Sequence, residues 1–368
     1  MLSERQSKQM KIKYSLPAIF SLSIILAACT YKVQNFSVSK LQLPTVNVIS
    51  NGVFYDIYAD KSKIVKRTSE QEGLVRISNE QIIRKITDDA RGYLTYDLML
   101  TVTLNPLCDN YDRIGSIKMV TVDAGKPYND PSAVTQEIFR FTTPFMNKNK
   151  QPDHVIFKTD ISQLSTVMKD KTKDIWIQAG IGGTTSAGQR QVEHCQDSFE
   201  TSMLTVDIVS SVSRKKTKQS YLPVVNFYEM KDGTTDSGNA KNFEFEITEK
   251  HKQHDLYFIT SAHGAARGGE EYTTREHVLY VDGKEVKRFT QNLDCTPYAQ
   301  YNTQNNGIYR GYSFERNKRS WCPGAAVPVH AIQLPALKKG KHTFKVDVPE
   351  ANLKNGYIHV SAYIISRN

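Results

Sequence analysis

The stretch LTYDLMLTVT at residues 94–103 gives the clearest indication of the fold. Every second side chain in it, from Leu94 to Val102, is apolar or aromatic, which places one set of side chains on one face of a β-strand. Shorter strand patterns recur at Ile175–Gln178, Leu204–Val209, Tyr221–Tyr228, Phe243–Ile247, Leu256–Thr260, His277–Val281, Thr343–Val348 and Tyr357–Ser366. Many short strands separated by turn residues predict an all-β protein built from β-sandwiches.

Two local patterns sharpen this prediction. The dipeptide Asp282-Gly283 lies between two strand patterns, and it accepts the positive φ angles of a tight hairpin turn. In the last strand pattern, the four alternating residues from Ile358 to Ile364 are expected to share one face. Only Asn79–Ala90 has a spacing that suggests a helix.

Composition excludes several classes of protein. The chain has 368 residues, with 39% hydrophobic and 10% aromatic residues, so it is neither disordered nor a polytopic membrane protein. Its 48 basic and 38 acidic residues give a net charge of +10, but the basic residues are scattered and form no stripe typical of nucleic-acid binding. The length suits two domains, and we expect a monomer.

The N-terminus reads as an export signal. Residues 1–13 are polar and basic, residues 16–28 are mostly apolar, and Leu26-Ala27-Ala28-Cys29 follows. This tetrapeptide resembles a bacterial lipobox, which implies that Cys29 carries a lipid and becomes the mature N-terminus. We therefore expect a lipid anchor at the bacterial outer membrane or cell surface, with the periplasmic face as an alternative; a plain secretion signal is the other interpretation.

We expect five segments along the chain. They are a signal peptide at 1–28, a tether at 29–44, an N-terminal domain at 45–210, a basic linker at 211–220 and a C-terminal domain at 221–368. The linker contains Arg214-Lys215-Lys216-Thr217-Lys218 and shows no apolar pattern.

Export favours oxidised cysteines. Apart from Cys29, the chain has four, which allow three pairings. Cys108–Cys195 with Cys295–Cys322 is the simplest choice, because it gives one bridge to each domain; free buried thiols are the alternative. The cysteine and histidine spacings contain no zinc pattern, so we expect no metal and no cofactor.

Two polar clusters are candidate sites. The first is Cys-Asp-Asn-Tyr-Asp-Arg at 108–113, where paired acids lie beside an arginine. The second is the glycine-rich segment from His263 to His277, which contains Gly269-Glu270-Glu271-Tyr272. Each suits a polar ligand or a general base, and each also suits an ordinary solvated turn.

A third segment resembles the signature of a known family. Trp321-Cys322-Pro323-Gly324-Ala325-Ala326-Val327-Pro328 resembles the signature of the peptide:N-glycosidase F family, bacterial amidases that remove N-linked glycans from asparagine. Residues 108–113, 139–145 and 269–277 resemble further segments of that family, in the same order along the chain. The resemblance implies two eight-stranded antiparallel jelly rolls packed side by side, with an active site between them.

The resemblance also implies roles for particular residues. Asp112 corresponds to the primary catalytic acid and Glu271 to a second essential carboxylate. Contacts to substrate are implied for four residues: Arg113, Trp321, His263 and Arg319. The implied substrate is an N-glycosylated peptide or protein, and the implied reaction converts asparagine to aspartate and releases a glycosylamine.

One departure from the family stands out. The family has a third carboxylate on a strand that corresponds to Ile175–Ile181, where this sequence has no acid and Gln178 is the nearest polar residue. Glu193 or Glu200 is a conceivable substitute from a neighbouring strand. The departure supports the alternative of a surface lipoprotein that binds glycans without hydrolysing them. A copper monooxygenase, which uses similar jelly rolls, is disfavoured because the nine histidines form no His-x-His pair.

Overall fold

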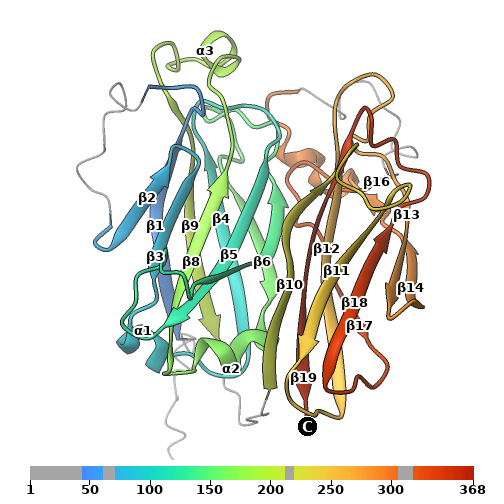
Figure 1. The fold of residues 1–368 in the computed structure, drawn as a ribbon. Coiled ribbons are helices and arrows are strands. Elements are labelled where there is room, and N and C mark those ends of the chain that lie inside the picture. Colours follow the sequence, from blue (N-terminus) through green and yellow to red (C-terminus); the bar gives the residue numbers. More distant parts are fainter. Residues whose placement is uncertain (1–43, 61–70, 212–218, 306–317) are drawn as a thin grey trace, which may run out of the picture. The chain divides into compact units, whose positions relative to one another are not determined.

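A computed structural model describes residues 44–60, 71–211, 219–305 and 318–368. Two β-sandwiches follow one another along the chain (Figure 1). Every strand pairing in the two sandwiches is antiparallel. The predicted all-β fold of two jelly rolls is confirmed. None of the helices in these ranges is long and apolar enough to cross a membrane.

The first sandwich encloses one apolar core between two sheets. One sheet has four strands, in the order β1 (Thr45–Tyr55), β9 (Glu200–Ser210), β4 (Leu98–Pro106) and β7 (Val155–Asp160). The other has five, in the order β2 (Leu74–Ser78), β3 (Gln81–Lys85), β8 (Lys173–Ile181), β5 (Ile114–Asp123) and β6 (Val134–Thr142). The described residues of the first sandwich therefore form nine strands, one more than the eight expected of each jelly roll.

The second sandwich has its own core between two four-stranded sheets. The first sheet runs β10 (Gln219–Met230), β19 (Tyr357–Arg367), β12 (Gln253–His263) and β17 (Val329–Gln333). The second runs β11 (Ala240–Ile247), β18 (Gly340–Asp347), β13 (Glu276–Val281) and β14 (Lys284–Thr290). A short ribbon joins β15 (Leu293–Asp294) to β16 (Lys318–Arg319).

The remaining elements are short. They are α1 (Asp88–Gly92), α2 (Ser165–Met168), α3 (Gly188–Gln191) and the 3-10 turns η2 (Ser162–Leu164) and η3 (Thr296–Tyr301). The helix suggested at Asn79–Ala90 was wrong over most of its length, because its apolar residues Ile82 and Ile83 lie in strand β3 and only its end enters α1.

Several sequence patterns can be compared with the strands that form. In β4, Leu98, Leu100, Val102 and Leu104 are buried and alternate with more exposed residues, so the periodicity at 94–103 is that of a strand, although the strand begins four residues later than expected. Asp282 and Gly283 have φ angles of 51° and 75° and form the turn of the β13–β14 hairpin, as predicted.

Both expected disulfides are present. One joins Cys108 to Cys195 and the other joins Cys295 to Cys322, so each sandwich carries one bridge. The lipobox at Cys29 and the basic run at 214–218 lie outside the described residues. Gln219 and Ser220, which we assigned to the linker, belong to β10.

Strand β19 is buried on both faces because it lies between the two cores. Ile358, Val360, Ala362 and Ile364 face the core of the second sandwich, as the sequence predicted. On the opposite face, Tyr363 and Ile365 join the core of the first sandwich. Strand β10 beside it lies against β6 in the middle of the view (Figure 1).

A fully buried ion pair lies at this interface. Arg140 of β6 donates two hydrogen bonds to Glu137, at 3.0 and 2.6 Å. The same guanidinium donates to the Ser261 hydroxyl at 2.7 Å and to the His359 carbonyl at 2.9 Å. Glu137 in turn accepts from the Ser361 hydroxyl at 2.6 Å. Protein groups, most of them from the second sandwich, therefore provide the hydrogen-bond partners of an ion pair that is shielded from solvent.

The segment Gly324–Val327 adds a second connection. The amides of Gly324 and Val327 donate to the carbonyls of Thr142 and Arg140, at 3.0 and 2.9 Å, and the Thr142 amide donates to Ala325 at 3.0 Å. The signature segment of the second sandwich therefore pairs with the free edge of β6.

We expect Arg140→Met to lower the free energy of unfolding by about 3–5 kcal/mol, because it leaves the Glu137 carboxylate buried without its counter-ion. Urea denaturation followed by circular dichroism measures this loss. The double variant Glu137→Leu/Arg140→Met should lie closer to the wild type, because no uncompensated charge remains. Arg288→Met, in an ion pair that is largely exposed, is the control and should leave the midpoint unchanged. A single variant as stable as the wild type would contradict this account.

Candidate functional site

A cavity of about 330 Å³ lies where the two sandwiches meet. The first sandwich contributes Asp112, Arg113, Ile114 and Gly182 to its lining. The second contributes Phe227, His263, Glu271, Trp321, Tyr357 and His359. The structure therefore brings Asp112 and Glu271, predicted from separate clusters of the sequence, to the same cavity.

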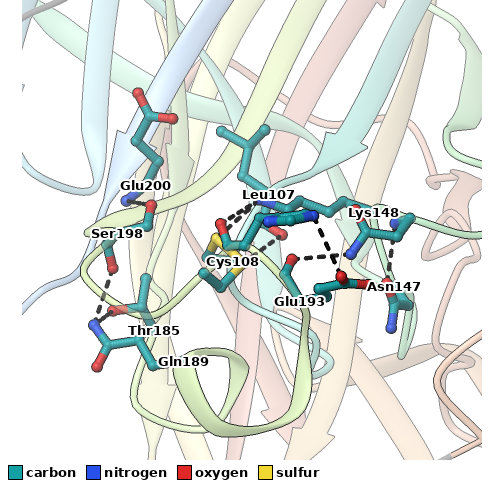
Figure 2. The surroundings of a disulfide bond; sticks show 12 residues. Leu107, Cys108, Asn147, Lys148, Thr185, Gln189, Glu193, Ser198 and Glu200 are labelled. Carbon is teal, nitrogen blue, oxygen red and sulfur yellow. Dashed lines mark hydrogen bonds and ion pairs between the residues drawn. A yellow bond between two sulfur atoms is a disulfide. The ribbon is translucent and has the colours of Figure 1, made fainter.

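The segment that carries Asp112 is braced from one side. Cys108, at its start, is bonded to Cys195, and Lys148 reaches both the Cys108 sulfur and the carbonyl of His194 (Figure 2). Helix α3 packs against Cys108 so closely that a Cβ at Gly188 would lie 1.9 Å from the Cys108 carbonyl oxygen. Because the chain is fixed here, Asp112 is held at the entrance to β5.

The two acids of the first cluster have different tasks. Asp109 accepts from Arg113 at 2.6 and 3.2 Å and from the amides of Tyr111 and Thr184, at 3.1 and 3.0 Å. It therefore shapes the loop. The Arg113 guanidinium is bonded to Asp109, and its charge also acts to lower the pKa of Asp112.

The second cluster divides its acids in the same way. Glu270 is fully buried and accepts two hydrogen bonds from Arg275, both 2.8 Å, and one from the Asn352 amide at 2.6 Å. It anchors the loop between β12 and β13. Glu271, the next residue, lines the cavity.

The backbone at Gly264 holds Glu271 in place. The Gly264 amide donates to Oε2 of Glu271 at 2.6 Å. Gly264 has a φ of 119°, and a Cβ there would lie 2.6 Å from the Cα of Gly356, so only glycine fits. Burial raises the pKa of Glu271 to about 7; the Gly264 hydrogen bond opposes this rise and the Asp112 charge adds to it.

Tyr272 links the two halves of the site. Its hydroxyl donates to Oδ2 of Asp112, and its ring packs against Trp321 with centroids 4.3 Å apart. Its φ of 62° is uncommon for a residue with a side chain, and strained backbone conformations cluster at functional sites. Burial raises the pKa of Asp112, while the Tyr272 hydrogen bond and the Arg113 charge act in the opposite direction.

Of three residues expected to contact the substrate, two line the cavity and one does not. Trp321 and His263 line the cavity, but each exposes only 2% of its surface. Trp321 donates to the Ala262 carbonyl at 2.7 Å and stacks near His263, so its main role here is to support Tyr272 and His263. Arg319 lies behind the Tyr272 ring, 5.9 Å from its centroid, and is not in the lining.

His263 is a neutral group in this setting. Burial lowers its pKa well below the usual value, and His359 and Arg140 add to the effect. Its Nε2 lies 2.6 Å from the Ser261 hydroxyl, which also accepts from Arg140. The cavity is therefore connected by hydrogen bonds to the buried ion pair between the sandwiches.

Neither suggested substitute for the missing carboxylate lines the cavity. Glu193 follows α3 on the surface beside His194, and Glu200 begins β9 opposite Tyr55. Gln178, on β8, donates a hydrogen bond to the side chain of Gln81 at 3.1 Å. No group of three His, Cys, Asp or Glu side chains within the described ranges is arranged to hold a metal ion.

The sequence analysis missed several lining residues. Phe227 occupies a bulge of β10, where its amide donates to Ser361 at 2.7 Å. Tyr357 and His359 alternate on the face of β19 that is turned away from the core of the second sandwich. Polar and aromatic residues opposite a continuous apolar set indicate a strand with an interface on its second face, and this signal was available in the sequence.

Comparison with known proteins places the chain in a family. Residues 45–190 match the family model described as Peptide-N-glycosidase F, N terminal, and residues 232–365 match Peptide-N-glycosidase F, C terminal. Together these matches cover most of the chain, in the expected order, and the chain belongs to the peptide-N-glycosidase F family.

Solved structures share the fold. PNGF-II has a TM-score of 0.67 at 20% identity; the alignment covers 89% of this chain and 66% of that one. PNGase F from Flavobacterium meningosepticum, described as a glycosylasparaginase, has a TM-score of 0.58 at 16% identity, with 88% and 96% covered. This chain therefore spans slightly less than two thirds of PNGF-II. No curated protein sequence matches the chain.

The raised pKa of Glu271 leads to a prediction about stability. The native state holds this proton from pH 4.5 to about 7, where the unfolded chain has released it, so the free energy of unfolding falls as pH rises through that window. Glu271→Gln removes the titration. We expect the variant to gain up to about 3 kcal/mol relative to the wild type between pH 4.5 and pH 7.5. Urea unfolding at both pH values measures the difference. Glu244→Gln, at an exposed position of β11, is the control, and an equal pH response in all three proteins would refute the prediction.

Proposed function

We propose that this protein hydrolyses the amide bond between asparagine and the innermost N-acetylglucosamine of an N-linked glycan. The observation that carries the proposal is the convergence of Asp112 and Glu271, one from each sandwich, on a single cavity. Membership of the peptide-N-glycosidase F family supports the substrate class.

In this scheme Asp112 acts as the general base and Glu271 as the general acid. Asp112 uses Oδ2 to accept from Tyr272, which leaves Oδ1 to orient and deprotonate a water molecule. That water attacks the side-chain carbonyl of the substrate asparagine and forms a tetrahedral intermediate. Arg113, which also lines the cavity, would stabilise the negative charge that develops on the oxygen.

Glu271 completes the reaction in this scheme. The Gly264 amide occupies its Oε2, so Oε1 is available to the glycosylamide nitrogen. A carboxyl with a pKa of about 7 transfers a proton at neutral pH at little cost. Protonation lets the nitrogen leave with the sugar; the peptide keeps an aspartate, and no glycosidic bond breaks.

The location of the protein is a separate proposal. We infer from the lipobox that Cys29 carries a lipid and holds the enzyme at a membrane facing exported or extracellular glycoproteins. Metabolic labelling with a fatty-acid analogue, compared between the wild type and Cys29→Ala, tests this proposal.

The decisive experiment compares the wild type with Asp112→Asn. An N-glycopeptide incubated with the wild type should yield a peptide with the mass of its aspartate form, which distinguishes amide hydrolysis from glycosidase action. Asp112→Asn should lower kcat by about a hundredfold or more, because asparagine cannot accept the proton. Asp89→Asn, on the exposed start of α1, is the control. If the wild type binds glycopeptides without any such mass change, the cavity is a glycan-binding site and not a catalytic one.

Tyr272→Phe offers a second test of the scheme. It removes the hydrogen bond that lowers the pKa of Asp112, so this pKa should rise and a larger fraction of Asp112 should be protonated in mild acid. The acidic limb of kcat/KM is therefore expected to move to higher pH, with little change at the optimum. A pH–rate profile measures the shift. A uniform loss at every pH would instead assign Tyr272 a packing role.

A further inference from the structure

One end of the second sandwich carries an excess of positive charge. It is formed by the loop 248–252, between β11 and β12, and by the loop 334–339, between β17 and β18. Four exposed lysines lie in these loops: Lys250, Lys252, Lys338 and Lys339. Glu249 is the only acid in either loop, so four positive charges face one negative charge. We call these four lysines the basic end.

The two loops lie side by side. Ile247, the last residue before the first loop, pairs with Gly340, the first residue after the second. The Leu334 amide, at the start of the second loop, donates to the His254 carbonyl at 2.8 Å. Within the described ranges, no side chain forms a hydrogen bond or ion pair with the four ammonium groups. Their charge is therefore available to a partner with negative charge.

The chain enters the first sandwich at the same end of the molecule. The carbonyl of Pro44 accepts from the amide of Ser210, where β9 ends, at 2.8 Å. The next strand, β10, begins at Gln219, which pairs with Arg367. The Arg367 carbonyl accepts from the Lys252 amide at 3.0 Å. Pro44 and the basic end thus share the end at which Figure 1 shows α1, α2 and the C-terminus.

The cavity lies at the opposite end of the second sandwich. Strand β12 runs from Gln253, next to the basic end, to His263, which lines the cavity. At about 3.3 Å for each residue, the strand separates the two by about 33 Å. A surface that touches the basic end therefore leaves the cavity open.

A membrane is the partner that this arrangement favours. Residues 30–43 separate Pro44 from Cys29, and even fully extended they span at most about 50 Å. A lipid on Cys29 would hold the basic end within that distance of a bilayer, which raises its effective concentration at the bilayer surface. Each lysine close to an anionic lipid surface strengthens binding by about fivefold. A soluble polyanion would gain nothing from the tether.

We propose that the loops 248–252 and 334–339 contact an anionic lipid surface, so that the cavity at the other end points away from the membrane. From the proposed anchor at Cys29 we take only the presence of a membrane near residue 44, and hydrolysis plays no part.

Vesicle binding by the chain from Thr30 onward measures this contact without the lipid. Both apolar cores lie within residues 44–368, so this part of the chain keeps the whole fold. It should bind vesicles of phosphatidylcholine with about one third phosphatidylglycerol, and not vesicles of phosphatidylcholine alone. Raising the salt concentration from about 0.1 M to about 1 M should release it, because the Debye length falls from about 10 Å to about 3 Å.

Paired charge removals locate the surface. Lys338→Gln/Lys339→Gln should weaken binding to the anionic vesicles by about 25-fold, which is about fivefold for each charge. The corresponding double variant of the first loop should lose a similar factor. Arg267→Gln/Lys354→Gln removes two exposed charges at the cavity end; it is the matched control and should bind like the wild type. The basic run at 214–218 stays unchanged in every variant.

Hydrogen exchange gives a second, independent measurement. On the anionic vesicles, the amides of 248–252 and 334–339 should exchange more slowly, whereas those of 264–272, beside the cavity, should keep their rates.

Several results would overturn the inference. They are binding that ignores lipid charge, equal binding by the loop variants and the control, and protection of 264–272 in place of the two loops. Binding to heparin without any preference for the anionic vesicles would assign the basic end to a soluble polyanion and overturn it as well. A failure to label Cys29 would remove only the anchor, and a failure to hydrolyse glycopeptides would remove only the proposed enzyme, because neither enters the vesicle measurement.

Discussion

The position of the two sandwiches depends on the buried pair of Arg140 and Glu137. Both side chains are inaccessible to solvent, and two charges in such surroundings are tolerated only if their remaining donors and acceptors are satisfied. Ser261, Ser361 and the His359 carbonyl satisfy them from the second sandwich. A shift of one sandwich against the other would therefore leave a buried charge without its hydrogen-bond partners. The energetic cost of such a shift fixes the geometry of the cavity, which has one carboxyl from each sandwich.

Sequence reasoning located nine of the strands from local periodicity, but it missed others, such as β1, β3 and β5. It chose the correct disulfide pairing because the four cysteines divide evenly between the two halves of the chain. It also named both cavity carboxyls, although only through resemblance to a family. Composition could not separate the acids within each cluster: Asp109 and Asp112 lie three residues apart, as like each other chemically as Glu270 and Glu271. In both clusters one acid shapes the loop and the other faces the cavity, and the partners that decide this, Arg113 with Thr184 and Arg275 with Asn352, become visible only in three dimensions.

The aromatic residues show a similar limit. A tryptophan in a signature segment beside a disulfide suggests a ligand contact, yet Trp321 is almost entirely buried and supports Tyr272. Tyr272 is the residue that reaches Asp112, and it does so from a backbone conformation with positive φ that no sequence pattern predicts.

The pairing of Gly324–Val327 with β6 has a consequence for the history of the fold. An unpaired edge strand presents free amide and carbonyl groups that invite association with other chains. Here the second sandwich covers that edge of the first, and β19 lends Tyr363 and Ile365 to the core of its neighbour. Neither half is a self-contained module that evolution could have exchanged freely. A gene rearrangement that separated the two halves would leave the edge of β6 unpaired and expose part of the core of the first sandwich. The two jelly rolls are therefore expected to be inherited together.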